Sequence, residues 1–369
     1  MTREQQREYK RQKLREQRRK EREAWEAARG PMDLPFLLLA LVLLVIGLIM
    51  LLSASFPSAQ ASKSCNYDPL YYFKRQGAFA LLGLVAMFWV SKINYQRFRG
   101  LARIAIVASF VLLVLVVIPG IGIWRNGARR WLGIPGTSFQ FQPSELAKLG
   151  IIVYFSASIA KKREKMLTFR NGILPYGLIL MGVAVLMAME PHASGMVLLV
   201  GIGAILMVVG GIDWRWVAAG LTAGGVGGYL LLFTDLMEKI GYNSDRITTW
   251  RDAFWDPTYK SFQMAQSLIA IGSGGLLGLG LGKGRQKFMF LPEEHNDFIF
   301  AIVCEELGLV GATLIMLLFA LFIIRGYWLA IHAKDRFGSL LIVGVTTQIA
   351  LQTFLNIAVV TGLIPATGI

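Results

Sequence analysis

The sequence has 369 residues, of which 55% are hydrophobic and only 17% are charged. Soluble domains carry about a quarter charged residues. Apolar runs of about 18 residues or more, long enough to cross a bilayer as a helix, recur along this chain. These runs are also too long for the strands of a membrane barrel. The composition therefore excludes an ordinary soluble protein and predicts an all-α, polytopic helical membrane protein.

The net charge of +15 comes partly from the N-terminus, where the first 30 residues hold 11 Lys and Arg against 6 Glu. This pattern predicts a basic cytoplasmic tail, residues 1–33, that is solvated and favours anionic lipid headgroups. No aromatic side chains are interleaved in the manner of a base-stacking surface, so nucleic acid is not an expected partner. The two cysteines, Cys65 and Cys304, match neither a disulfide framework nor a metal-ligand spacing.

About nine apolar segments are predicted to cross the membrane. The short loops after the second, fourth and eighth segments are rich in Lys and Arg, and together with the tail they define one side. The excess of positive charge in cytoplasmic loops makes that side, and the N-terminus, cytoplasmic. The loop 235–297 is then external. The nine segments are 34–54, 76–93, 104–120, 145–160, 173–190, 195–211, 215–234, 298–324 and 338–361.

The short external loop 121–144 carries Arg129 and Arg130 beside Trp131. Positive charge is depleted from short external loops, so these arginines indicate an anionic ligand at the outer face. The longer external loop also holds several Lys and Arg, but long loops translocate regardless of charge.

The fourth span begins with Ser144 as a candidate N-cap after a proline. Glu145 and Lys148 follow one turn apart on the same face. Two alternatives stay open for this pair. The two side chains could form a local ion pair at a helix start, or they could face a polar cavity at membrane depth.

Glycines form two patterns. Gly220, Gly224 and Gly228 repeat at a spacing of four in the seventh span, which predicts close helix packing. The glycine-rich run 271–284 ends in Gly-Lys-Gly, but it lacks the residues that a phosphate-binding loop requires at its first and last positions. Its glycines are instead predicted to let the backbone approach a helix or a ligand closely.

The long loop is predicted to contain interfacial or re-entrant helices. Apolar residues recur at helical spacing from Ser244 to Leu268, and Asp256-Pro257 interrupts the pattern.

Residues 293–297 gather two glutamates, a histidine, an asparagine and Asp297 at the mouth of the eighth span. Four interpretations stay open: an N-cap, a divalent metal site, a proton-coupled transport carboxylate, or a general base beside an anionic substrate. The outer position argues against a proton carrier at mid-bilayer. Burial near apolar walls would raise the pKa of a carboxyl group towards the range that suits a base.

Four segments of the chain carry a family resemblance: G-A-R-R-W (127–131), F-Q-P-S-E-L-A-K-L (141–149), the segment 261–282 and the segment 290–308. Through them the chain resembles the SEDS family (FtsW, RodA, SpoVE), and the similarity runs from its first span to its last residue. The family pattern Q-P-D-x-G-T reads E-P-H-A-S-G at 190–195, so a role for an acidic residue there is not carried over. The family usually continues past 367–369 into a tenth helix, so the domain 34–369 is expected to be truncated before its last helix.

The resemblance implies a division-type peptidoglycan glycosyltransferase that polymerises lipid II at the outer face of the bacterial cytoplasmic membrane. Asp297 falls at the essential aspartate of the family. A divalent cation, Mg or Mn, could assist the pyrophosphate. The implied partners are lipid II, membrane lipids, a class B penicillin-binding protein and other division proteins. The residues expected to bind substrate are Arg129, Arg130, Trp131, Glu145, Lys148, Gln266, Lys283, Lys287 and His295.

Two rival functions stay open. A lipid II flippase would use the same basic residues but would need polar residues along the inner halves of its spans, and these are apolar here. A division scaffold would depend on the charged tail.

Overall fold

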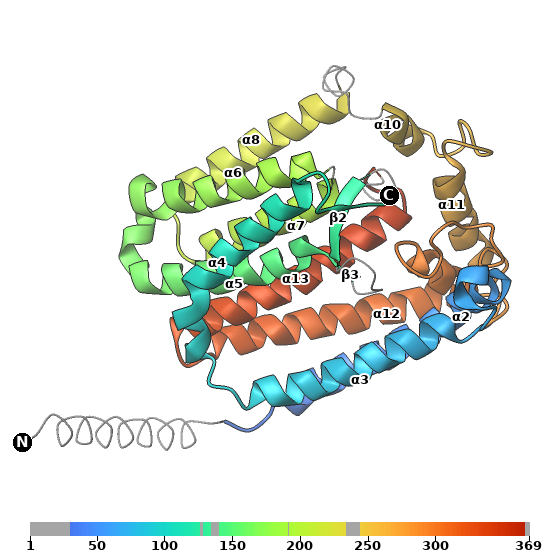
Figure 1. Cartoon of the computed structure of the whole chain (residues 1–369), viewed down its shortest axis with the longest axis horizontal. Coiled ribbons are helices and arrows are strands. Elements are labelled where there is room, and N and C mark those ends of the chain that lie inside the picture. Colours follow the sequence, from blue (N-terminus) through green and yellow to red (C-terminus); the bar gives the residue numbers. More distant parts are fainter. Residues whose placement is uncertain (1–29, 126–127, 134–139, 191, 234–243, 366–369) are drawn as a thin grey trace, which may run out of the picture.

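The structure is a computed structural model that describes residues 30–125, 128–133, 140–190, 192–233 and 244–365. Most of the predicted tail therefore lies outside the described residues. Helices dominate the rest, which confirms the predicted helical fold (Figure 1). The long helices are α2 (Leu34–Ala61), α3 (Tyr71–Ser91), α4 (Gln96–Val117), α5 (Pro143–Lys162), α6 (Leu174–Met189), α7 (Ala193–Val209), α8 (Trp214–Phe233), α12 (Ile299–Ile331) and α13 (Arg336–Val360).

Each of the nine predicted spans coincides with one of these helices. Six described helical segments combine the length and the hydropathy of a membrane span, and α7 is apolar but has only 17 residues. Many large apolar side chains stay exposed along the helices, among them Leu81, Ile104 and Met181. A bundle with an apolar outside is what a lipid environment requires.

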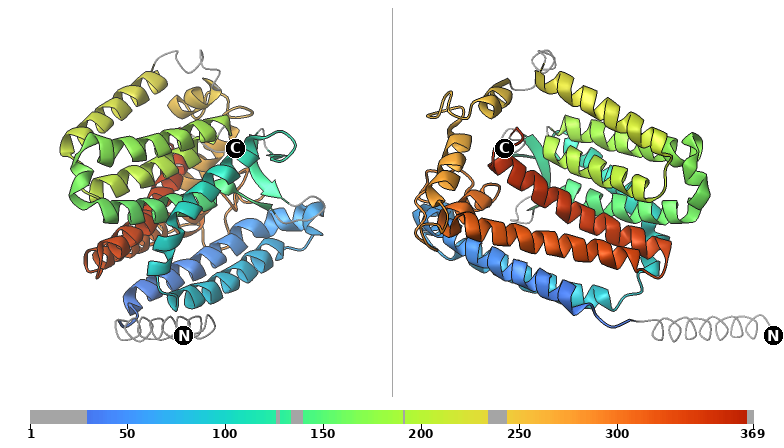
Figure 2. Two further views of the ribbon diagram at one scale, coloured as in Figure 1. Left: turned by 60° about the vertical axis from the view of Figure 1, so that its left-hand side comes forward. Right: turned by 180° about the vertical axis from the view of Figure 1, so that it is seen from behind.

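The helices pack side by side in one bundle (Figures 1 and 2). From one edge, α3 packs on α2, α2 on α12, and α12 on α13, which in turn packs on α5 and α7. Helices α4 and α6 cover the far side of that group. The buried apolar residues divide into two cores, one among α4–α7 and the first half of α13, the other among α2, α11, α12 and the end of α13.

Polar contacts close the end of the bundle where α12 ends and α13 begins. Asp33 caps α2, accepting from the Phe36 N–H at 2.9 Å, and pairs with Arg325 of α12 at 2.6 Å. Asp335 caps α13 and accepts hydrogen bonds from Tyr95 and from the amide of Gln96. These side chains satisfy helix-start N–H groups that would otherwise lack partners.

The opposite end carries a small antiparallel sheet that the sequence did not predict. Its strands are β1 (Ile123–Arg125), β2 (Ala128–Gly133) and β3 (Gln140–Phe141), in the order β1-β2-β3. Aromatic and β-branched residues, which favour strands, are interspersed with the arginines here. The sheet gives Arg129, Arg130 and Trp131 a fixed backbone.

Two shorter helices occupy the loop 235–297, where the sequence predicted helices. They are α10 (Ser244–Arg251) and α11 (Phe262–Gly274), and the Asp256-Pro257 break falls between them. The Ser267 hydroxyl donates to the Val360 carbonyl of α13 at 2.8 Å, so α11 is tied to the bundle.

The glycine pattern in the seventh span behaves differently from the prediction. Helix α8 lies at the edge of the bundle (Figure 1), and a Cβ added to Gly220 or Gly224 would meet no atom within 4 Å among the described residues. The predicted close packing at these two glycines is therefore wrong for the part of the chain that the structure describes.

The glycine-rich run has the predicted close approach, and its target is a helix. Helix α12 is broken at Gly308, whose φ of 67° and ψ of −170° are not helical. Residues 275–287, the glycine strap, lie against this break. Four backbone hydrogen bonds replace those that the helix lacks: Leu279 N–H to Glu305 O, Gly280 N–H to Glu306 O, Leu309 N–H to Gly275 O, and Val310 N–H to Leu276 O, at 2.9–3.1 Å.

Only glycines allow this approach. A Cβ placed on Gly278 would overlap the Glu306 carbonyl and lie 2.6 Å from the Gly308 nitrogen. A Cβ on Gly274 would lie 3.0 Å from the Cα of Glu305. The irregular backbone is tolerated within the bundle because the strap satisfies it.

Candidate functional site

Asp297 lies just before α12, at the end of the bundle that holds the sheet and the strap. The N-cap of α12 is Phe298, without a side-chain hydrogen bond, so the interpretation of Asp297 as the N-cap is wrong. Its backbone carbonyl instead accepts from the Asn356 amide of α13 at 2.9 Å. The carboxylate is therefore held at the end of the helix by its backbone and stays available for chemistry.

The surroundings of Asp297 favour a base. Its side chain keeps an open approach, but dense protein around it desolvates the charge, and this raises the pKa of Asp297. The negative charge of Glu293 raises this pKa further, and the positive charge of Arg130 offsets part of the rise. A carboxyl whose pKa is raised is a stronger proton acceptor once it is ionised.

Arg130 of β2 is the charge that links the groups of this site. Its positive charge lowers the pKa of Asp297, of Glu190 and of His192, so all three lie within its electrostatic reach. The three come from two separate segments: Asp297 precedes α12, and Glu190 and His192 lie at the turn between α6 and α7. The fold thus gathers groups from distant parts of the chain around one arginine.

Glu190 and His192 were not predicted as site residues. Glu190 is 1% exposed, and neither of its carboxyl oxygens has a hydrogen-bond partner among the described residues. Burial raises the pKa of Glu190 to about 8. Burial, followed by the charges of Arg130 and Lys148, lowers the pKa of His192 to about 4, and Gln142 contacts its Nδ1 at 3.1 Å. Both groups are thus neutral near pH 7.

Lys148 and Glu145 form the local ion pair that was one of the two alternatives. The Lys148 ammonium lies 2.8 Å from the Glu145 carboxylate and 3.3 Å from the amide oxygen of Gln352 on α13. Lys148 is 2% exposed, whereas Glu145 is exposed. A buried lysine at the start of α5 also supplies charge to the site, as its effect on His192 shows. The two alternatives therefore do not exclude each other.

The expected cap at Ser144 is not formed. Gln142 is the N-cap residue of α5, and the buried Ser144 hydroxyl has no hydrogen-bond partner among the described residues.

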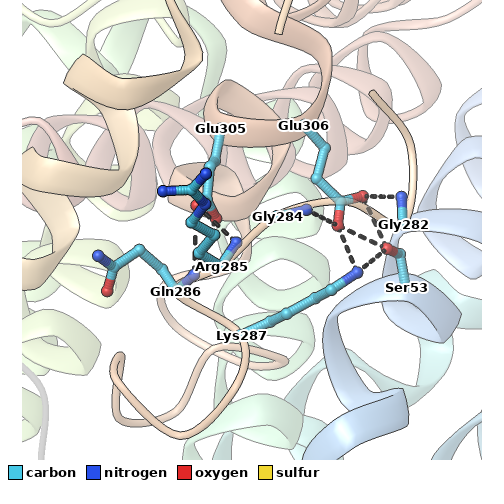
Figure 3. Close-up of polar contacts among 8 residues, drawn as sticks. All are labelled: Ser53, Gly282, Gly284, Arg285, Gln286, Lys287, Glu305 and Glu306. Carbon is cyan, nitrogen blue, oxygen red and sulfur yellow. Dashed lines mark hydrogen bonds and ion pairs between the residues drawn. The ribbon is translucent and has the colours of Figure 1, made fainter. Parts of the chain in front are cut away.

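The glycine strap separates two lysines that were expected to act alike. Lys283 is exposed, whereas Lys287 is 3% exposed and its ammonium lies 2.7 Å from the Glu306 carboxylate and 3.1 Å from the Ser53 hydroxyl (Figure 3). Lys283 can meet a phosphate without rearrangement. The role of Lys287 in substrate binding stays a prediction, because its ammonium group already has the Glu306 carboxylate as a partner within the protein.

The remaining predicted residues lie around the same end of the molecule. Arg129 stacks on Trp124 at 5.4 Å within the sheet, and Trp131 is half-buried beside it on β2. His295 lies 4.3 Å from the Tyr72 ring of α3, between ring centroids, and contacts Glu294 at 3.4 Å. Gln266 is half-buried on α11.

No group of three His, Cys, Asp or Glu side chains suited to a metal ion occurs in the described parts of the chain. The protein ligands present around Asp297 do not form a closed metal site by themselves. The expected divalent cation stays a prediction, and a pyrophosphate substrate would have to bring part of its coordination.

Comparison with known proteins agrees with this architecture. The model of the cell cycle protein family of FtsW, RodA and SpoVE matches residues 33–369. The chain belongs to the FtsW/RodA/SpoVE family.

Relatives with names cover most of this member of the family. Stage V sporulation protein E of Bacillus subtilis is 41% identical over 339 residues, which are 91% of this chain and 89% of that protein. The probable peptidoglycan glycosyltransferase FtsW of Geobacter sulfurreducens is also 41% identical, with 91% and 88% of the two chains covered.

Two solved structures share the fold. A chain from a structure of a peptidoglycan synthase complex that coordinates polymerization and crosslinking gives a TM-score of 0.73, at 24% identity, covering 91% of this chain and 89% of that one. A mutant of the rod shape determining protein RodA of Thermus thermophilus gives 0.63, at 25% identity, covering 91% and 88%.

In this family member, three of the polar residues that the sequence missed share one signal: they are ionisable or amide side chains within an apolar span or at its end. Glu190 is an ionisable residue at the end of an apolar span, and such residues usually have a function. Gln352 and Asn356 are amides within α13, one turn apart, and they mark the face of that helix that meets the site. Ser53 gave no such signal, because serines are common in membrane helices.

Proposed function

We propose that this chain is a peptidoglycan glycosyltransferase that polymerises lipid II at the outer face of the bacterial cytoplasmic membrane, in cell division. Family membership and the names of its relatives support the reaction class. The single observation that carries the proposal is the placement of Asp297: an exposed carboxylate at one end of the bundle, within electrostatic reach of Arg130, with its pKa raised.

Asp297 acts as the general base. The 4-hydroxyl of the acceptor sugar gives its proton to the Asp297 carboxylate as its oxygen attacks the anomeric carbon of the donor. The bond from that carbon to the phosphate oxygen breaks, and undecaprenyl pyrophosphate leaves with the electron pair. General base catalysis contributes about 10²–10⁴-fold.

The leaving pyrophosphate gains negative charge and needs cations near it. Arg130, Arg129 and the exposed Lys283 are the side chains that supply them in this proposal. A bound divalent cation would add to this charge. The undecaprenyl chain lies against the apolar outside of the helices.

The orientation of the chain follows from its Lys and Arg. The basic tail and the loop 161–170 lie in the cytoplasm, and the loop 235–297 lies outside. The proposed partner is a class B penicillin-binding protein, a transpeptidase that links the new strands. The structural likeness to a chain of a peptidoglycan synthase complex supports a partner of this kind.

The test measures glycan strands formed by the purified protein from lipid II, with and without the partner. Asp297→Asn is close in shape to Asp but cannot take the proton, so we expect a loss of about 10²-fold or more. Glu293→Gln is the matched control from the same loop and keeps the base, so its loss is smaller. Near wild-type polymerisation by folded, membrane-inserted Asp297→Asn would refute the proposal. Transport of lipid II without polymerisation would favour a flippase.

A further inference from the structure

The two carboxylates near the start of α12 hold the glycine strap through a dense set of hydrogen bonds (Figure 3). Glu305 accepts from the backbone N–H groups of Arg285 at 2.7 Å and Gln286 at 3.2 Å. Glu306 accepts from the backbone N–H of Gly282 at 3.0 Å and of Gly284 at 3.4 Å. The two side chains thus fasten residues 282–286 to the helix.

Lys287 completes this arrangement. The Glu306 carboxylate is fully buried and receives the Lys287 ammonium at 2.7 Å and the Ser53 hydroxyl of α2 at 2.6–2.8 Å. Every strong acceptor site of the carboxylate therefore has a donor. A buried pair of charges is retained at a considerable desolvation cost, and replacement by apolar groups is often neutral for stability, so stability alone does not explain it.

The position of the pair in the chain suggests what it does. Lys287 precedes, and Glu306 follows, the segment 288–298 that carries Asp297. The ion pair therefore closes a loop around the proposed base, while the hydrogen bonds at the helix break fix the strap just before it. Three neighbouring helices also contact the segment 288–298 itself. Asn356 donates to the Asp297 carbonyl at 2.9 Å, Gln263 donates to the Pro292 carbonyl at 3.3 Å, and the Tyr72 ring lies against His295.

We propose that the Lys287–Glu306 pair, with Ser53, is a positioning element that sets the location of Asp297 for catalysis. This inference rests on the proposed function, because it assigns the pair a role in that reaction. Lys287 and Glu306 act through the backbone of the segment 288–298 and are positioning residues. Geometry errors of about 1 Å can cost about 10²-fold in rate, so a loosened loop would lower kcat strongly.

The experiment compares single and double variants of the full chain. Glu306→Gln or Lys287→Met alone leaves a buried charge without its partner, so both lower Tm. The double variant Lys287→Met/Glu306→Gln leaves no unpaired charge and should recover much of the lost Tm. We expect kcat to stay about 10- to 100-fold below wild type in the double variant, with KM for lipid II within about threefold.

A matched control uses the ion pair at the other end of the same two helices. Asp33→Asn/Arg325→Met removes a half-buried pair that also joins α2 to α12, and it keeps an acceptor for the α2 cap. We expect its kcat to remain within about threefold of wild type.

A second readout does not depend on activity. Amide hydrogen exchange across 282–298 should be faster in the double variant and unchanged in the control. If the double variant recovers both Tm and kcat, or if the control loses kcat equally, the positioning role is refuted.

If wild-type protein forms no glycan from lipid II, the proposed function fails, and hydrogen exchange alone decides this inference. Faster exchange in the double variant supports the positioning of the segment, and unchanged exchange overturns it.

Discussion

Gly278→Ala tests how the glycine strap fits into the break of α12. Gly278 has a φ of +77°, and moving an L-residue into this left-handed region costs about 1–2 kcal/mol. The added Cβ would overlap main-chain atoms of Glu306 and Gly308, which cannot swing away as a side chain could. The strap must move, and each buried backbone group left without its partner costs about 1–3 kcal/mol. We expect a total of about 3–5 kcal/mol.

The assay is thermal unfolding in detergent, followed by tryptophan fluorescence, with Gly275→Ala as the control. Gly275 also has a positive φ, of +55°, but a Cβ there would meet no atom within 4 Å. The ψ of Gly275 is −145°, a backbone region that is essentially restricted to glycine, so Gly275→Ala carries a conformational cost alone, about 1–3 kcal/mol. Only Gly278→Ala adds an overlap with the main chain of the broken helix. Equal Tm values for Gly278→Ala and Gly275→Ala would refute the reasoning that the strap must lie in contact with the broken helix.

Three further predictions concern charge. Glu190 keeps its proton in the folded protein up to about pH 8 but loses it near pH 4.5 in the unfolded chain, so the wild-type Tm should fall as the pH rises between these values. Glu190→Gln should remove this dependence of Tm on pH. Parallel Tm curves for the two proteins from pH 4.5 to 9 would contradict this prediction. Arg130→Ala removes the positive charge that lowers the pKa of Asp297, so the acid limb of the pH–rate profile should move to higher pH. An acid limb that does not move would show that the charge of Arg130 does not act on Asp297. Asp335→Ala removes the cap of α13 and the acceptor of Tyr95, and should cost about 1–2 kcal/mol by thermal unfolding, whereas Asp335→Asn should retain most of the stability.

Apolar runs and glycines predicted the features of this fold that depend on local chemistry. Each predicted span appears as a helix, because an apolar segment in lipid has to satisfy its backbone internally. The close approach of the run 271–284 to a helix is also confirmed, since residues without Cβ indicate contact between backbones. The break between α10 and α11 was predicted from Asp256-Pro257.

Long-range pairing accounts for what the sequence did not show. Lys287 resembled Lys283 in sequence, and only the fold directs one to Glu306 and leaves the other exposed. The clustering of Glu190 and His192 near Arg130 depends on a sheet of three short strands, which has no repeating pattern long enough to read. The close packing predicted for Gly220 is wrong because small residues permit another helix to approach but do not require it to do so.

The division of the apolar interior into two cores has a consequence for catalysis. Asp297 is attached to the core of α2, α11 and α12, whereas Lys148 and the turn with Glu190 belong to the core of α4–α7. The first group is fastened at both ends, by Arg325–Asp33 and by Lys287–Glu306. Helix α13 joins the two cores, because Gln352 contacts Lys148 and Asn356, one turn further along, donates to the Asp297 carbonyl. The distance between the proposed base and its neighbouring charges therefore depends on how this one helix sits, and a change in its position would alter that distance without unfolding any helix.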